Sequence, residues 1–160
     1  MGSRPNIENL AYIAGFLDGD GSLMLQVKKR SDTSRGWRMM ATICFYQDSR
    51  HSKPLNWIKK QLKIGYISNR NDGITELRIN GFEKVEKILK MLSPFIKFKK
   101  NQVQTVLKAI KLMQEKDFSD FKTLDYKKLI KFLLDVQNEN YQSSHKKTGQ
   151  NLEKIFGLTP

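Results

Sequence analysis

The spacing of apolar residues predicts alternating helices and strands. Apolar side chains recur every three or four positions over residues 7–17, which predicts a helix that stops at the acidic and glycine-rich residues 18–21. Strict alternation over residues 22–28 and 38–46, separated by polar residues 31–36, then predicts two half-buried strands. Their inward sets are Leu23, Leu25 and Val27 in the first strand and Met39, Ala41, Ile43 and Phe45 in the second.

The next segments repeat this order of elements. Ser52 and Pro54 predict an N-capped helix that ends before Gly65. Residues 66–70 and 75–79 flank an Asp-Gly pair, which predicts a β-hairpin. A third helix follows from Phe82 to Leu92 and is broken at Ser93 and Pro94, and helical spacing returns over residues 102–113, 124–136 and, weakly, 151–156. The prediction is an α+β fold of order α-β-β-α-β-β-α with additional C-terminal helices.

Length and composition narrow the class of protein. A chain of 160 residues with no internal repeat suits a single domain over residues 1–160, since the polar stretch 137–150 is too short to separate domains. We interpret Met1, Gly2 and Ser3 as residues left from cloning. The 39% hydrophobic and 28% charged residues exclude a membrane span and a disordered chain. The single cysteine, Cys44, excludes an intramolecular disulfide and favours a reducing compartment.

The charge balance indicates the partner. Lys and Arg number 29 against 16 Asp and Glu, so the formal charge is +13. This excess favours an anionic partner, of which nucleic acid is the first candidate.

The acidic end of the first helix is a candidate metal site. Asp18 and Asp20 stand at a helix C-terminus, where the helix dipole disfavours negative charge and a cation would compensate. Carboxylates beside helix carbonyls are the hard oxygen ligands that Mg²⁺ uses together with water and phosphate. The alternative is a plain turn that joins helix to strand.

One face of the same helix carries only small residues, Ala11, Gly15 and Gly19. Interior glycine destabilises a helix by up to about 1 kcal/mol relative to alanine, so Gly15 indicates close packing. A second copy of this helix across a two-fold axis would provide it, and would bring two copies of Asp20 together around a cation. Packing of the small face within one chain is the alternative.

Residues 11–21, AYIAGFLDGDG, resemble the signature helix of the LAGLIDADG homing endonucleases. The resemblance extends through Gln47, residues 64–66 and residues 93–100, and the predicted element order is similar to that of the family. It implies an αββαββα fold with an antiparallel sheet saddle. One motif in a chain of this length resembles the homodimeric, intron-encoded group.

The resemblance also implies roles for particular residues. Asp20 matches the metal-binding aspartate of the family, and Gly19 matches a residue that lends its carbonyl to the metal. Gln47 matches the glutamine that positions water, and Lys99 matches the active-site lysine. A further basic role falls to Arg50 or to His51, and the sequence leaves both open. Metal-assisted phosphodiester hydrolysis suits these residue types.

The outward strand positions are candidates for base recognition, because a two-stranded ribbon fits the major groove of DNA. The predicted set is Met24, Gln26, Lys28, Arg30, Arg38, Met40, Thr42, Cys44, Tyr46, Ser68, Arg70, Glu76 and Arg78. Lysines in polar segments, Lys146 and Lys147 among them, are expected to contact phosphates. A solvated sheet face is the alternative for the first set.

The leading prediction is a homodimeric, Mg²⁺-dependent endonuclease that cleaves double-stranded DNA at a long pseudo-palindromic target. The alternative is a non-cleaving binder, either an RNA maturase or a DNA-binding regulator, which need not keep Asp20, Gln47 and Lys99 together. We expect no membrane partner and no small-molecule substrate. The resemblance implies that the reducing compartment could be an organelle, either a mitochondrion or a chloroplast.

Overall fold

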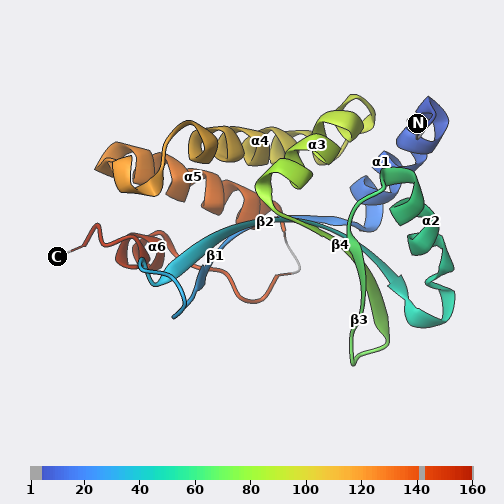
Figure 1. The fold of residues 1–160 in the computed structure, drawn as a ribbon, viewed down its shortest axis with the longest axis horizontal. Coiled ribbons are helices and arrows are strands. Elements are labelled where there is room, and N and C mark those ends of the chain that lie inside the picture. The colour runs from blue at the N-terminus through green and yellow to red at the C-terminus, as the bar shows by residue number, and fades with distance from the viewer. Residues whose placement is uncertain (1–4, 141–142, 160) are drawn as a thin grey trace. The chain divides into compact units, whose positions relative to one another are not determined.

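A computed structural model describes residues 5–140 and 143–159 of the chain (Figure 1). Met1, Gly2 and Ser3, interpreted as cloning residues, lie outside the described residues. The elements follow in the predicted order, α1 Ile7–Asp20, β1 Ser22–Lys29, β2 Trp37–Asp48, α2 Lys53–Leu62, β3 Tyr66–Asn69, β4 Ile74–Asn80, α3 Phe82–Leu92, α4 Lys100–Glu115, α5 Thr123–Glu139 and α6 Gly149–Ile155. The α+β prediction, C-terminal helices included, is confirmed.

The strands form one sheet in the order β1-β2-β4-β3, with β4 antiparallel to both β2 and β3. The chain divides into two compact units. The first unit comprises residues 1–23 and 42–100, and the second comprises residues 24–41 and 101–160. The single domain over residues 1–160 stays a prediction.

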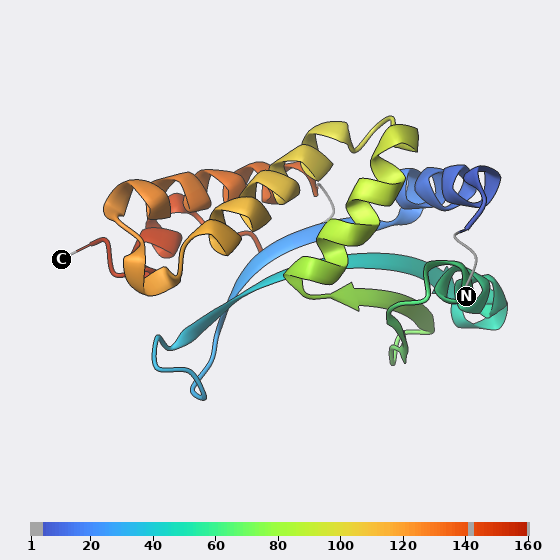
Figure 2. The ribbon, with the colours of Figure 1, turned by 45° about the horizontal axis from the view of Figure 1, so that its top comes forward.

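The core of the first unit lies where α1, α2 and α3 meet the inward residues of β2 and β4. Its fully buried side chains include Ile13, Leu17, Ile43, Phe45, Leu55, Ile58, Leu77, Ile79, Ile88 and Leu89. Burying each such side chain contributes roughly 1.5–3 kcal/mol. Helices α1 and α2 lie side by side (Figure 2), where Tyr12 and Trp57 meet edge to face with centroids 5.6 Å apart.

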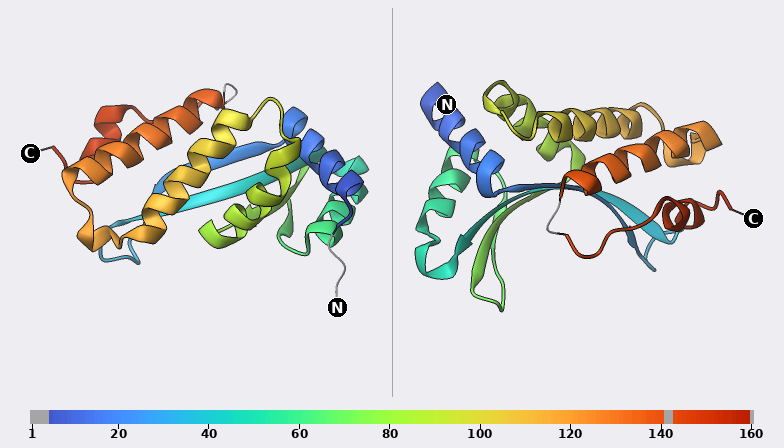
Figure 3. Two further views of the ribbon diagram at one scale, coloured as in Figure 1. Left: turned by 90° about the horizontal axis from the view of Figure 1, so that it is seen from above. Right: turned by 180° about the vertical axis from the view of Figure 1, so that it is seen from behind.

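The second unit is built on the three C-terminal helices and the residues of β1 and β2 that belong to it. Helices α4 and α5 run antiparallel (Figure 3), and the Nε2 of Gln102 in α4 donates to the carbonyl of Val136 in α5 over 3.4 Å. Trp37, Phe118, Phe121, Tyr126 and Phe156 form a connected set of ring contacts with centroids 4.8–5.2 Å apart. This aromatic cluster anchors α5 and α6 to the start of β2.

Three local predictions are corrected by the structure. Helix α1 continues to Asp20 instead of stopping before the acidic residues. Ser52 occupies the N-cap position of α2, but its hydroxyl donates to the Ser49 carbonyl over 3.1 Å and makes no cap hydrogen bond. Strand β3 ends at Asn69, so Arg70 lies in the turn, where Gly73 has φ +81°. The predicted hairpin itself is confirmed.

Candidate active site

The C-terminus of α1 lies against the backbone of β2. The Gly21 N–H donates to the Leu17 carbonyl over 3.1 Å and closes the helix. A Cβ at Gly21 would lie 2.6 Å from the Leu17 side chain and 3.0 Å from the Cys44 carbonyl oxygen. Glycine is therefore required at this close approach, which places the end of α1 three residues along β2 from Gln47.

Asp18 and Asp20 have opposite environments although they are two residues apart. Asp18 is 7% exposed, whereas Asp20 is exposed. Because each helical residue turns by about 100°, side chains two positions apart point to nearly opposite sides. Asp18 therefore faces the protein, and Asp20 faces outward.

The carboxylate of Asp18 accepts three consecutive backbone N–H groups from the segment before α4. Its Oδ2 accepts from Lys97 over 2.5 Å and from Phe98 over 3.1 Å, and its Oδ1 accepts from Lys99 over 3.0 Å. The Lys99 Nζ in turn donates to the Asp18 carbonyl over 2.6 Å. The structure thus brings Lys99 to the end of α1, as the resemblance implied.

Lys99 is half-buried at this position. Burial lowers the pKa of its ammonium, and the nearby carboxylates of Asp18 and Asp20 oppose that shift. The hydrogen bond from Lys99 Nζ to the Asp18 carbonyl places Lys99 at the same helix end as Asp20.

Gln47 lies near the C-terminal end of β2, and Arg50 follows in the 3₁₀ turn Ser49–His51. Gln47 is half-buried, and its Oε1 accepts from the Asp48 N–H over 2.9 Å. Arg50 forms a bidentate pair with Asp48, with Nε–Oδ1 at 3.0 Å and Nη2–Oδ2 at 2.8 Å. The hydrogen bonds from Arg50 hold the pKa of the Asp48 carboxyl well below its usual range. Arg50 and His51 are both exposed, so the basic role stays open between them.

Asp20 and Gly19 fit a hard divalent cation. Both residues are exposed at the helix end, and they offer a carboxylate and a backbone carbonyl. Oxygen donors of this kind, completed by water and phosphate, suit Mg²⁺. The described residues contain no group of three or more His, Cys, Asp or Glu side chains arranged for a metal ion.

The small face of α1 has no close neighbour within the described part of the chain. Gly15 and Gly19 are exposed, and a Cβ at either position would meet nothing within 4 Å. Packing of these two glycines within one chain, the alternative raised by the sequence, is thus contradicted. Two large side chains are also exposed, Tyr12 on α1 itself at 65% and Phe98 in the segment that Asp18 contacts at 86%.

The outward positions of the first unit require three corrections. Thr42, Cys44 and Glu76 were predicted on an exposed recognition face, but they are 2%, 0% and 4% exposed. Alternation gives the correct side of the sheet, but these residues lie on the inner strands β2 and β4, where they are buried. Cys44, for example, lies opposite Arg78, and burial raises the pKa of its thiol.

Glu76 is buried between two arginines. Its Oε1 lies 3.2 Å from Nη1 of Arg70, and its Oε2 lies 2.9 Å from Nη1 of Arg78. Arg70 also pairs with Asp72. Of the predicted recognition residues, the solvent-accessible ones in this unit are therefore Tyr46, Ser68, Arg70 and Arg78.

The outward positions of the second unit are accessible as predicted. Met24, Gln26 and Met40 are half-buried, and Lys28, Arg30 and Arg38 are exposed. Arg30 lies one residue beyond β1 and pairs with Asp32 over 2.8 Å. Lys146 and Lys147 are exposed, and the backbone of Lys147 is bound on both sides by the Gln137 amide.

Sequence reasoning missed Tyr66, Asn80 and Ser22 on these surfaces. Tyr66 lies on the same side of β3 as Ser68, and its hydroxyl accepts from Asn80 over 2.9 Å. Ser22 shares a 2.8 Å hydrogen bond with the Tyr46 hydroxyl. Alternation from Ser68 could have found Tyr66. No local signal could have found the Asp18 contacts, which span 79 to 81 residues.

Comparison with known proteins agrees with this geometry. The LAGLIDADG endonuclease family model matches residues 13–110, which include the end of α1, Gln47 and Lys99. The chain belongs to the LAGLIDADG endonuclease family. Within this family it is similar to DNA endonuclease I-CreI of Chlamydomonas reinhardtii, with 28% identity over 125 residues that cover 78% of this chain and 76% of the relative. It is also similar to DNA endonuclease I-CvuI of Chlorella vulgaris, with 31% identity over 101 residues and 63% of each chain.

Solved LAGLIDADG structures share the fold. I-CvuI in complex with its target in the presence of 2 mM Ca matches with a TM-score of 0.80 and 23% identity, over 96% of this chain and 97% of that one. The archaeal intron-encoded endonuclease I-Vdi141I, complexed with DNA, matches with a TM-score of 0.79 and 20% identity, over 94% of this chain and 96% of that one.

In the described residues of the present chain, no helix is long and apolar enough to span a membrane.

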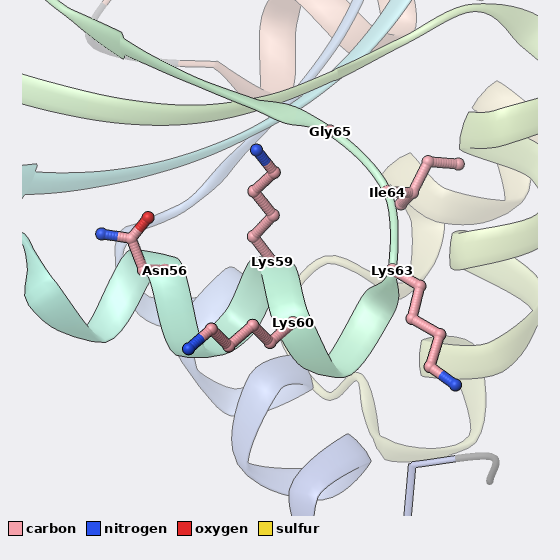
Figure 4. Close-up of a pocket in the computed structure, with 6 residues that line it drawn as sticks. All are labelled: Asn56, Lys59, Lys60, Lys63, Ile64 and Gly65. Carbon is pink, nitrogen blue, oxygen red and sulfur yellow. The ribbon is translucent and has the colours of Figure 1, made fainter. Parts of the chain in front are cut away.

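A basic pocket of about 390 Å³ lies at the junction of α2 and β3 (Figure 4). Asn56, Lys59, Lys60, Lys63, Ile64 and Gly65 line it. Figure 4 shows Lys59 and Lys63 pointing to different sides of α2, so their ammonium groups do not converge on one ligand. The pocket contributes positive charge and carries none of the predicted active-site residues.

Proposed function

We propose that this chain is a homodimeric, metal-dependent endonuclease that cleaves double-stranded DNA at a specific target, with Mg²⁺ as its metal. One observation carries the proposal. An outward-facing carboxylate, Asp20, and a lysine fixed beside it, Lys99, lie at the end of an exposed small-residue helix face in a LAGLIDADG chain. The structures of I-CvuI bound to DNA in the presence of 2 mM Mg or 2 mM Ca support a divalent metal.

Each residue of this site would have a separate role in phosphodiester hydrolysis. Asp20 and the Gly19 carbonyl would hold the metal, which when bound supplies charge neutralisation at the phosphate and activation of water. Lys99 offsets the negative charge that develops on the phosphate. Gln47 orients water through its amide, while Arg50 or His51 adds a second positive group.

The dimer follows from the uncovered face of α1. Close approach of two helices requires small residues, and Gly15 and Gly19 are exposed on that face. Two copies related by a two-fold axis would bind a target that is roughly symmetric about its centre. Gly15→Leu should block the approach and abolish dimerisation. Sedimentation of the parent as a monomer, both free and bound to DNA, would contradict the homodimer.

Positive charge and the outward strand positions support DNA as the substrate. The formal charge is +13, and the accessible side chains Gln26, Arg38, Arg70 and Arg78 include the residue types that pair with guanine and adenine in the major groove. Lys146 and Lys147 would contribute phosphate contacts that do not depend on sequence.

Selection from a randomised double-stranded DNA library tests the function and finds the target together. We expect recovery of cleaved molecules that share one pseudo-palindromic sequence when Mg²⁺ is present, and none when EDTA replaces it. If the protein binds a specific sequence but does not cleave it with any divalent metal tested, the result would instead favour the alternative of a non-cleaving nucleic-acid binder.

A further inference from the structure

The buried carboxylate of Asp18 has a role that the hydrolytic site described above does not use. It lies at 7% exposure inside the last turn of α1, on the side opposite to Asp20. A buried charge is unfavourable unless it is well hydrogen-bonded, so its partners determine what it does.

Among the described residues, the hydrogen-bond partners of Asp18 outside its own helix lie in residues 97–99. The carboxylate accepts from three backbone N–H groups, and the Asp18 carbonyl accepts from Lys99 Nζ over 2.6 Å. Lys99 is therefore held at both ends, since its own N–H reaches the Asp18 carboxylate over 3.0 Å while its ammonium reaches the Asp18 backbone.

The held segment has no regular structure of its own. Residues 97–99 are bends between the 3₁₀ turn Ser93–Phe95 and the start of α4 at Lys100. Without helix or sheet hydrogen bonds to fix it, this backbone takes its position from Asp18. Asp20 lies two residues after Asp18 in the same turn of α1. Helix α1 therefore sets the positions of both the Asp20 carboxylate and Lys99.

We propose that Asp18 is the positioning residue of the active site, which fixes Lys99 relative to Asp20. This inference rests on the proposed function, because it assigns Lys99 a part in DNA cleavage. Asp18 itself contacts neither substrate nor metal; it acts through residues 97–99.

Asp18→Asn tests the proposal with nearly unchanged side-chain volume. The amide offers one acceptor oxygen where three N–H groups converge, and its NH₂ group faces donors. We expect the single-turnover cleavage rate at saturating DNA and Mg²⁺ to fall about 100-fold, a loss that misplacing a catalytic group by about 1 Å can cause. Target affinity measured in Ca²⁺ should stay close to that of the parent. Asp18→Glu, which restores both acceptor oxygens, should recover part of the rate.

Asp125→Asn is the matched control. Asp125 is also 7% exposed and also accepts a backbone N–H, that of Lys122 over 3.0 Å, but it lies at the start of α5. Asp125→Asn should lower the thermal midpoint of unfolding without changing the cleavage rate. Equal rate losses in the two variants would show that Asp18 acts only through stability, and a parental rate in Asp18→Asn would overturn the proposal.

A second measurement does not depend on cleavage. Limited acetylation of the protein, read by mass spectrometry, reports how exposed each lysine ammonium is. Lys99 should become several-fold more reactive in Asp18→Asn, with the exposed Lys100 unchanged, and should keep parental reactivity in Asp125→Asn. Unchanged labelling of Lys99 in Asp18→Asn would contradict the positioning role. If Lys99 is acetylated as expected in the parent and in Asp18→Asn but the parent cleaves no DNA, the proposed function is overturned. The positioning of Lys99 by Asp18 is then still supported.

Discussion

Two buried carboxylates in the first unit hold positively polarised groups in different ways. Asp18 binds three backbone N–H groups, which cannot leave without moving the chain. Glu76 binds two arginine side chains, which can rotate away toward another acceptor. The first arrangement suits chemistry that is the same at every target. The second suits recognition, in which a guanidinium exchanges a carboxylate for a base edge.

The largest effect is expected at the end of α1. Asp20→Asn keeps the shape of the side chain and removes its charge, and in a homodimer both copies change. Cleavage should be lost nearly completely because the metal loses its carboxylate. Binding without metal should be at least as tight as in the parent, since negative charge near phosphates is removed. Nicking and binding assays on one labelled duplex check both.

The exposed Asp117 in the second unit provides the control, because Asp117→Asn makes the same chemical change away from α1. It should leave cleavage unaffected. Substantial Mg²⁺-dependent cleavage by Asp20→Asn would show that Asp20 is not the essential ligand, and a loss of metal-free binding would show a structural role.

The next effect concerns the arginines held by Glu76. Glu76→Gln removes the charge that orders Arg70 and Arg78, so discrimination at the base pairs they contact should weaken by roughly 1–3 kcal/mol. Affinity for non-specific DNA should rise, because the chain loses a negative charge. Competition binding with singly substituted targets measures both. Glu83→Gln, an exposed position on α3, makes the same charge change and should leave discrimination unchanged.

A smaller effect separates base contacts from phosphate contacts. Arg70→Ala should relax preference at one position in each half-site by about 1–3 kcal/mol, whereas Lys147→Ala should weaken all sequences about equally. A binding matrix over substituted targets gives the result. If Arg70→Ala weakens every sequence alike, Arg70 contacts phosphate and the exchange suggested for Glu76 does not occur at that arginine.

The smallest effect is on stability at alkaline pH. Burial raises the pKa of Tyr46 to about 12, above the value of about 10 for an unfolded tyrosine. The folded state therefore keeps the neutral phenol while the unfolded state ionises, so this contribution is full below pH 10 and is lost as pH rises through about 12. Tyr46→Phe should flatten that decline in urea unfolding.

The same substitution removes the hydrogen bond to Ser22, which should lower stability at neutral pH by about 0.5–1.5 kcal/mol. Tyr12→Phe, at an exposed position of α1, is the matched variant. Equal alkaline slopes in the parent and in Tyr46→Phe would show that the Tyr46 phenol does not titrate as stated.

The sequence predicted the elements well because their apolar periods are strong. It misplaced the end of α1 because acidic and glycine residues suggest a turn, while in the structure the helix continues to Asp20 and is closed by the Gly21 N–H. Alternation assigned Thr42, Cys44 and Glu76 to the correct face but could not show that they are buried on it, because burial depends on strand order and on contacts distant in the sequence. Asp18 was seen only as part of an acidic cluster, because its partners are about 80 residues away.

The two tryptophans give each unit its own fluorescent reporter. Trp37 lies in the second unit within the aromatic cluster, with the Arg35 guanidinium 5.0 Å above its ring, and Trp57 lies in the first unit against Tyr12. Replacing either one by Phe leaves an emission signal that comes from a single unit. A single domain requires both variants to unfold at the same urea concentration, after allowance for the substitution itself. Separate midpoints would mean that the second unit, which contains the start of β2, and the first unit, which contains the end of α1, unfold independently.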